Sequence, residues 1–226
     1  MILNVYKPKG WTSFDVVAKL RAILGARKIG HAGTLDPLAE GVLIVLTGED
    51  TKKQHEYMKM RKEYVAEIGF GASSETYDLE SELNVSACRP NLEEVERKIR
   101  EVIPTFMGEI EQIVPPYSAK KIKGVRMYKK AREGKLTQEQ LPVKRITIYS
   151  FKVLGFYEEE VFTQTGKMTL PVMRCKIECS SGTYIRSIAN DIGKIFEGGV
   201  LISLIRARVG PFLVEESKRV EDVRPT

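Results

Sequence analysis

A single carboxylate, Asp36, lies in the stretch GTLDPLAEGVL, where a glycine turn precedes it and Pro37 stiffens the chain behind it. His31 comes before the turn, and the apolar run Val42–Leu46 after it predicts a buried strand. An Asp-Pro pair commonly starts a turn, so Asp36 has a plain structural explanation. A carboxylate held still on a loop can also act as a nucleophile, because a covalent adduct divides one difficult step into easier ones. This stretch alone leaves both explanations open.

Three stretches place apolar residues at helical spacing and predict the amphipathic helices of the fold. The first runs from Asp15 to Gly25, with Ser13 before it as a cap. The second, Asn91–Ile103, begins at its own cap, Asn91. The third begins within SGTYIRSIANDIGKIF. Their inward faces are Val16, Leu20, Ile23 and Leu24, then Leu92, Val95, Ile99 and Val102, then Ile185, Ile188, Ile192 and Ile195.

Alternating apolar residues predict strands between these helices. Glu63–Gly71 places Tyr64 on one side with Ala66, Ile68 and Phe70, and Ile146–Tyr157 and Leu170–Cys179 alternate in the same way. Strands and helices mix without a regular βα alternation, so we expect an α+β fold and not a doubly wound one.

Charge is distributed unevenly along the 226 residues. Residues 1–62 carry 11 Lys or Arg and 6 Asp or Glu, residues 63–112 carry 4 and 12, and residues 113–152 carry 11 and 2. Two basic blocks are thus separated by an acidic one. Concentrated cations indicate a polyanionic partner, although a solvated basic surface explains them equally well.

The least core-like part is Val114–Arg145, which opens with Pro115 and Pro116 and carries most of the second basic block. We expect it to form an excursion from the domain. No repeat or low-complexity segment interrupts the rest of the chain.

Membrane and metal classes find no support in the sequence. No run of 18 apolar residues exists, and the N-terminus lacks the apolar region of a signal peptide, so a cytoplasmic protein is expected. In a strand, Cys175 and Cys179 would lie about 13 Å apart, too far for a disulfide. With Cys88 they are expected to be reduced thiols and not metal ligands.

Six stretches together resemble the TruB family of tRNA pseudouridine synthases. They are KPKGWTS, HAGTLDPLAEGVL, KEYVAEIGFG, PPYSAKKIKGVRMYKKAREG, CSSGTYIRSIANDIG and LIRARVGPF, in the family's order over nearly the whole chain. Taken singly, Asp36 could be a turn residue, Tyr64 a core aromatic and Arg186 a surface charge at a helix start. Their combination is what makes the resemblance specific.

The resemblance implies an isomerase that converts the uridine at position 55, in the T-arm loop of tRNA, to pseudouridine. The C1′–N1 bond breaks, the base turns, and C1′ rejoins the base at C5. The target nucleotide must be flipped out of its folded loop. The resemblance also implies no metal and no organic cofactor, with tRNA as the partner. We expect a monomer.

The same resemblance assigns the site residues. Asp36 matches the nucleophile, and Arg186 matches the basic partner that keeps a buried carboxylate ionised. Tyr64 matches the aromatic that stacks on the target base and takes the C5 proton. Ordinary core packing also explains some of the other positions, chiefly Tyr184 and Leu204. The substrate contacts expected are His31, Gly33, Thr34, Tyr184, Leu204, Arg206 and Lys9, with Tyr128, Lys130 and Arg132 in the inserted segment.

The chain departs from the family pattern in three places. SETYDLES replaces the usual T-D-T-x-D-x-x-G but keeps Thr76 and Asp78, and Ile205 replaces the first of two arginines while Arg206 keeps the second. The chain also ends too soon for a full C-terminal PUA domain, which favours a stand-alone bacterial-type enzyme. The organisation expected is one catalytic domain over 1–226, with a basic inserted segment at about 114–145.

The fold implied is a mixed, largely antiparallel sheet flanked by helices, with an RNA-contacting insertion. Two other functions use the same fold: a catalytically inactive protein that helps tRNA to fold, and a guide-RNA-dependent synthase subunit. Modification of a bare T-arm stem-loop by the protein alone would separate the three.

Overall fold

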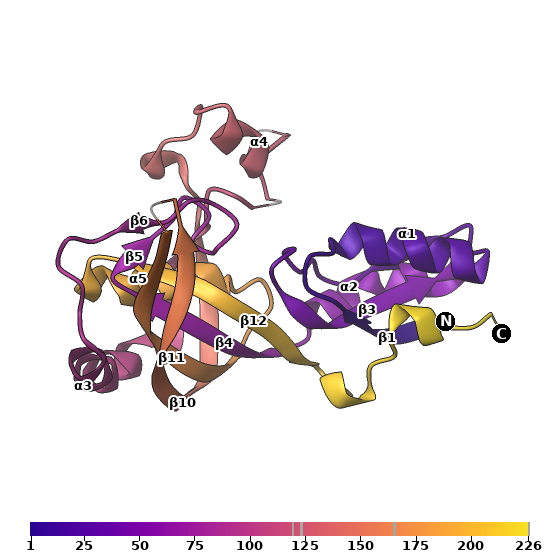
Figure 1. The fold of residues 1–226 in the computed structure, drawn as a ribbon. Coiled ribbons are helices and arrows are strands. Elements are labelled where there is room, and N and C mark those ends of the chain that lie inside the picture. The colour runs from indigo at the N-terminus through magenta and orange to yellow at the C-terminus, as the bar shows by residue number, and fades with distance from the viewer. Residues whose placement is uncertain (119, 123, 165, 226) are drawn as a thin grey trace. The chain divides into compact units, whose positions relative to one another are not determined.

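The computed structural model describes residues 1–118, 120–122, 124–164 and 166–225 (Figure 1). The chain forms two compact units. The first unit comprises Met1–Val65, Lys176–Ser181 and Ser203–Thr226, and the second comprises Ala66–Cys175 and Gly182–Ile202. The organisation as one catalytic domain over 1–226 with an insertion at about 114–145 stays a prediction.

The first unit contains most of the N-terminal elements and the C-terminal segment. Its elements are β1 (Ile2–Lys7), α1 (Ser13–Leu24), β2 (Ile29–His31), β3 (Glu40–Thr47), the 3₁₀ helix η1 (Gly48–Lys53), α2 (Gln54–Lys59), β13 (Phe212–Leu213), η5 (Val214–Glu216) and η6 (Val220–Asp222). Three strands have residues in both units: β4 (Lys62–Phe70), β11 (Gly166–Cys179) and β12 (Gly199–Val209).

The second unit contains the remaining elements. These are β5 (Ala72–Ser73), β6 (Asn84–Val85), α3 (Leu92–Val102), η2 (Ile103–Phe106), β7 (Gly108–Ile113), β8 (Lys121–Ile122), β9 (Val125–Arg126), α4 (Met127–Arg132), η3 (Gln138–Gln140), β10 (Val143–Thr163), α5 (Ile185–Gly193) and η4 (Lys194–Phe196).

Strand pairing gives a mixed and mostly antiparallel sheet. In the first unit β3 pairs antiparallel with β1 and β2, and β12 pairs antiparallel with β13. β3 and β12 run parallel, with Glu40 opposite Ile205 and Gly41 opposite Arg206. In the second unit the order is β12-β4-β11-β10-β7, and β10 pairs antiparallel with β7. The predicted α+β fold with a largely antiparallel sheet and helices is confirmed.

Helix α1 covers β1 and β3 in the first unit (Figure 1). Its residues Val16 and Leu20 pack against Val5 and Leu43 in a buried cluster that also takes in the C-terminal segment. The predicted helix is confirmed, but its cap is not Ser13. Thr12 is the N-cap, because its side chain accepts from the Asp15 amide while the Asp15 carboxylate accepts from the Thr12 amide.

The other predicted elements are confirmed with small differences. Asn91 caps α3, and β4 buries Tyr64, Ala66, Ile68 and Phe70 on one side. The predicted inward face of the third helix is wrong at Ile195, which is 40% exposed, because α5 ends at Gly193 and the chain turns there. Strand β10 is longer than predicted at both ends.

The segment predicted as an excursion, Val114–Arg145, contains β8, β9, α4 and η3. In Figure 1 the part around α4 projects from the strands of the second unit. This segment has a small hydrophobic core that the sequence does not predict. Val114, Met127 and Leu141 form a buried cluster, and Tyr184 packs against it. This cluster fixes the basic residues of α4 to a defined backbone.

Candidate active site

The loop that carries Asp36 is fastened to the start of α1. Ser13 Oγ accepts from the Leu35 amide at 2.9 Å and donates to the Leu35 carbonyl at 3.1 Å. The Gly10 amide donates to the Pro37 carbonyl at 2.8 Å, so both neighbours of Asp36 are held. Ser13 is buried whereas Asp36 is half-buried. The carboxylate is thus displayed by a backbone that is fixed on either side of it.

Lys7 supports the same loop from β1. It is fully buried, and its ammonium donates to the carbonyls of Pro8 at 2.9 Å, Trp11 at 2.5 Å and Pro37 at 3.4 Å. A buried lysine is costly unless its donors are satisfied, so these carbonyls are required neighbours. The segment KPKGW therefore supports the Asp36 loop through the buried Lys7 and is not an exposed basic tail.

Arg206 holds the other side of the Asp36 loop. This residue is 1% exposed, and its guanidinium donates to the carbonyls of Val42 at 2.7 Å, Gly33 at 3.1 Å and Thr34 at 3.4 Å. A planar guanidinium can make several such bonds at fixed angles, which a lysine cannot reproduce. In this structure Arg206 therefore organises the loop, and the contact with RNA that the sequence predicts stays a prediction.

Two glycines with positive φ lie next to this arginine, and one of them, Gly41, leaves no space for a side chain. Gly41 lies opposite Arg206 with φ +103°, and a Cβ there would be 2.4 Å from the Arg206 carbonyl oxygen. Gly33 has φ +105°, and a Cβ there would be 3.7 Å from Arg206 Nη1. Backbone with positive φ strains any residue other than glycine, so both positions favour glycine. Arg206 therefore binds the loop at the glycine turn before Asp36, through the carbonyls of Gly33 and Thr34.

Tyr64 brings a hydroxyl to Arg206 and Asp36. It is 8% exposed on β4, and burial raises the pKa of its hydroxyl above the ordinary value of 10.0. The Arg206 guanidinium beside it lowers that pKa, and the charge of Asp36 raises it. With burial the largest effect, the hydroxyl stays protonated at neutral pH. Asp36, Tyr64 and Arg206 therefore form one electrostatic cluster within the first unit.

His31 lies at the end of β2 beside this cluster. Burial, followed by the positive charge of Arg206, lowers the pKa of His31 below its ordinary 6.5, so the imidazole is neutral at pH 7. Its Nδ1 is buried without a hydrogen-bond partner in the described structure, while the Gln54 side chain donates to its carbonyl at 2.7 Å. Because its imidazole is neutral and Nδ1 makes no hydrogen bond, His31 is better suited to contact the substrate than to pair with the charge of Asp36.

Arg186 has its own carboxylate in the second unit. Its Nε lies 3.4 Å from Asp78 Oδ2, with both side chains almost wholly buried. Its two terminal nitrogens donate to the carbonyls of Thr76 at 2.7 Å and Tyr117 at 2.9 Å. Thr76 Oγ1 also donates to Asp78 Oδ1 at 2.5 Å. The residues kept from the family loop thus bind the expected catalytic arginine, and its pairing with Asp36 stays a prediction.

Replacing Asp78 by Asn should destabilise the protein by about 3–5 kcal/mol, because it leaves the Arg186 charge buried without its carboxylate. Urea unfolding measures the change in free energy. Asp191→Asn is the matched control, since Asp191 pairs with Lys194 at an exposed site and should cost less than about 1 kcal/mol. Equal losses from the two variants would contradict the importance of the buried pair.

The remaining predicted contacts of the second unit lie around α5 and α4. The Gln112 side chain accepts from the Tyr184 amide at 2.8 Å and donates to the Tyr184 carbonyl at 3.0 Å. In α4 the guanidinium of exposed Arg132 lies 5.8 Å from the ring centre of Tyr128, and Lys130 is half-buried. Tyr184 thus stands on the same framework as the basic segment.

Three further predicted contacts belong to the first unit. Lys9 and Thr34 are exposed, as surface contacts to RNA require. Leu204 on β12 is 6% exposed, and its contact with substrate stays a prediction. His55, for which the sequence suggests no role, is exposed as expected. Sequence reasoning missed the supports Lys7 and Ser13, although both lie inside the quoted motif KPKGWTS.

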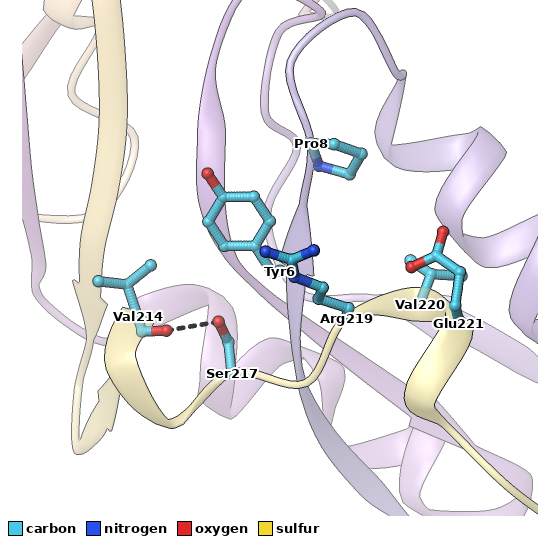
Figure 2. Close-up of a pocket in the computed structure, with 7 residues that line it drawn as sticks. All are labelled: Tyr6, Pro8, Val214, Ser217, Arg219, Val220 and Glu221. Atoms are coloured by element: carbon cyan, nitrogen blue, oxygen red, sulfur yellow. Dashed lines mark hydrogen bonds between the residues drawn. The ribbon is translucent and has the colours of Figure 1, made fainter.

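A pocket of about 600 Å³ lies in the first unit between β1 and the C-terminal segment (Figure 2). Figure 2 shows the Arg219 side chain extending toward the ring of Tyr6, with Glu221 further along the C-terminal segment. The Tyr6 hydroxyl donates to Glu40 at 2.7 Å, and burial with this bond raises the pKa of Tyr6 to about 12. The lining includes none of the residues predicted for catalysis.

The described residues also bear on metal and membrane classes. No group of three or more His, Cys, Asp or Glu in the described ranges is arranged to hold a metal ion. Across the same ranges, no helix is both long and apolar enough to cross a lipid bilayer. Cys88 is exposed, Cys175 and Cys179 are buried, and these three residues form no disulfide in the described ranges.

The chain that carries this loop-borne aspartate and this mixed sheet is similar to pseudouridylate synthases. The description "TruB family pseudouridylate synthase (N terminal domain)" matches residues 21–185 of the chain. The chain belongs to this family. It is 42% identical to "tRNA pseudouridine synthase B" of Dehalococcoides mccartyi over 98% of this chain and 69% of that relative.

Other relatives give the same result. The protein of the same name from Thermotoga maritima is 42% identical, over 99% of this chain and 67% of its own length. The one from Bacteroides fragilis (strain ATCC 25285) is 40% identical, over 95% of this chain and 88% of its own length.

Solved structures share the fold. A chain in "Crystal Structure of a Cbf5-Nop10-Gar1 Complex" matches with a TM-score of 0.68 and 29% identity, over 98% of this chain and 52% of that one. A chain in "Structure of H/ACA RNP bound to a substrate RNA containing 2'-deoxyuridine" matches with a TM-score of 0.65 and 26% identity. This chain thus spans about half the length of these solved chains.

Proposed function

We propose that the protein isomerises the uridine at position 55 in the T-arm loop of tRNA to pseudouridine. The observation that carries this proposal is the Asp36 loop, whose backbone is bonded by Ser13 and Lys7 on one side and Arg206 on the other. Relatives more than 40% identical over nearly the whole chain bear the name tRNA pseudouridine synthase B. Both the residues and their framework suit this chemistry.

The reaction is an isomerisation whose atoms balance within the nucleotide. The C1′–N1 bond breaks, a C1′–C5 bond forms, C5 loses a proton, and N1 gains one. Asp36 acts as the nucleophile, by attack at C1′, by addition at C6, or after removal of a ribose proton to give a glycal. All three routes need an ionised, fixed carboxylate. Fixing the loop before the substrate arrives reduces the reorganisation that each route requires.

Arg206 and Arg186 have different roles in this proposal. Arg206 donates to the loop carbonyls of Gly33 and Thr34, and its positive charge acts on Tyr64. Arg186 keeps the role that the resemblance implies, a basic residue that favours the ionised nucleophile, and its terminal nitrogens donate to the backbone carbonyls of Thr76 and Tyr117. A buried guanidinium favours the charged form of a neighbouring carboxylate.

Tyr64 serves as the aromatic floor for the target base and as a proton relay. Its raised pKa keeps the hydroxyl neutral, so it can accept the C5 proton only by passing on its own. His31, Gly33, Thr34, Tyr184 and Leu204 contact the flipped nucleotide. Lys9 and the basic segment at 114–145, with Tyr128, Lys130 and Arg132, bind the RNA backbone by shape and charge.

Removing the hydroxyl in Tyr64→Phe should slow the chemical step by about 10²–10⁴-fold while leaving RNA binding nearly unchanged, because the ring remains. Single-turnover rates at saturating enzyme measure this step. Tyr57→Phe is the control, since Tyr57 packs on Phe212 in the same unit at a ring distance of 6.0 Å. A Tyr64→Phe enzyme with a wild-type rate would remove Tyr64 from the proton transfer.

The proposal extends to the state of the enzyme. It works as a single catalytic domain and a monomer in the cytoplasm, without metal or organic cofactor and without a guide RNA. The solved chains that share the fold occur in multi-protein or RNA complexes, so independence from partners needs its own test.

Release of label from tRNA that carries tritium at uridine C5 tests the function directly. Purified protein alone, in the presence of a chelator, should release one equivalent of tritium per tRNA. No release from either intact tRNA or its T-arm stem-loop would overturn the proposal. Release only after addition of a guide RNA and partner proteins would favour the guide-dependent alternative.

A further inference from the structure

Phe14 is an exposed aromatic residue beside the catalytic loop. It is 65% exposed in the first turn of α1, directly after Ser13, whose hydroxyl bonds the Leu35 backbone on both sides. A phenylalanine left in water forgoes the stabilisation that burial would give. Its position is therefore explained better by a partner than by the core of the protein.

The geometry of α1 keeps Phe14 away from the core. The buried side of the helix is formed by Ser13, Val16, Val17 and Leu20. Phe14 lies on the outer side with Ala18 and Arg21, which follow it by four and seven residues and are also exposed. The capping box of Thr12 and Asp15 fixes the turn that carries the ring. The ring is thus presented on a rigid support.

The charge around Phe14 indicates what kind of partner it meets. Residues 1–39, all described, contain six Lys or Arg and only two Asp. One of the two, Asp15, is engaged in the capping box, and the other is Asp36. The exposed cations of this stretch are Lys9, Lys19, Arg21, Arg27 and Lys28. A single aromatic among cations fits nucleic acid, because bases stack on the ring while phosphates meet the positive charges.

We infer that Phe14 is a stacking platform for an unpaired base of the substrate RNA, next to the uridine that enters the site. This inference rests on the proposed function and adds a specificity residue to it. Bases of RNA loops can be splayed out and stacked on aromatic side chains. The ring stands one residue from the Ser13–Leu35 contact, so the base that it holds belongs to the same loop as the target.

Binding of a T-arm stem-loop at fixed salt, measured by fluorescence anisotropy, tests the platform. Phe14→Ala should weaken binding by about tenfold, since one base–aromatic stack is typically worth a factor of this order. Phe14→Leu should be as weak as Ala because it keeps apolar bulk without a π face, and Phe14→Trp should bind as wild type. Phe162→Ala removes a ring that is 77% exposed in the second unit and should change nothing.

Abasic substitution then identifies the stacked nucleotide. Removing the base that Phe14 holds should weaken wild-type binding about tenfold and should cost Phe14→Ala nothing further. Wild-type binding by Phe14→Ala, full affinity in Phe14→Leu, or additive losses at every loop nucleotide would each overturn the inference. Failure of the proposed function looks different, because the wild-type protein would then release no tritium whatever residue 14 does.

Discussion

Asp36→Asn should lower the single-turnover rate of pseudouridine formation by more than about 10³-fold, because the amide keeps the shape of the carboxylate but is not a nucleophile. RNA affinity should stay within about threefold of wild type. The loop around residue 36 is held through backbone groups of Leu35 and Pro37, so the substitution leaves those bonds in place. The loss should therefore fall on the chemical step.

The matched control is Asp50→Asn in the same unit. Asp50 is bonded to the N-terminal amine at 2.7 Å and to Lys53 at 2.8 Å, and these interactions hold its pKa at about 2. Its neutralisation should leave the rate at wild-type level. An Asp36→Asn protein that retains a tenth of the wild-type rate would show that Asp36 does not provide the nucleophile.

Arg206→Met should cost about 3 kcal/mol or more of unfolding free energy. The substitution removes the donor from the carbonyls of Val42, Gly33 and Thr34, and the bond to Val42 is buried away from water. It also frees the loop on the side of Gly33, so the rate of the folded variant should fall by about 10²-fold because a small misplacement of the carboxylate is costly. Urea unfolding and single-turnover kinetics measure the two effects.

Arg208→Met, two residues further along β12, is the natural comparison. Arg208 lies 3.1 Å from Glu178 and 3.8 Å from Glu63 with its side chain 31% exposed. Partly exposed pairs of this kind contribute up to about 1 kcal/mol, and no loop depends on this one. If Arg206→Met were as stable and as active as Arg208→Met, the loop-clamping role of Arg206 would be wrong.

Local patterns predict the helices and most strands correctly because each is amphipathic over its own length. α3 has its cap at Asn91 and its buried residues Val95 and Ile99 where helical spacing puts them. The predicted cap of α1 is wrong by one residue because Thr12 and Ser13 are both good caps, and only the contact of Ser13 with Leu35 decides between them. Such a contact joins distant positions and leaves no local pattern.

The functional residues show the same limit. The types and order of Asp36, Tyr64 and Arg186 within their motifs are enough to indicate the family. Charge suggests that Arg206 meets RNA, yet it is buried and holds the loop. A lone arginine or lysine in a sequence normally indicates a surface position, and only the folded structure reveals the three backbone carbonyls that Arg206 binds. The role of Lys7 cannot be predicted from the sequence for the same reason, since it is fully buried among backbone carbonyls.

The measurement that tests the central claim most directly is nucleotide-resolution mapping of pseudouridine in an unmodified T-arm stem-loop. The wild-type protein and Asp36→Asn are each incubated with the RNA, with no other component present. The account predicts pseudouridine at one loop uridine, position 55, from the wild type and none from the variant. Equal product from both proteins, or product at several unrelated uridines, would contradict the claim that Asp36 on its fixed loop isomerises this nucleotide.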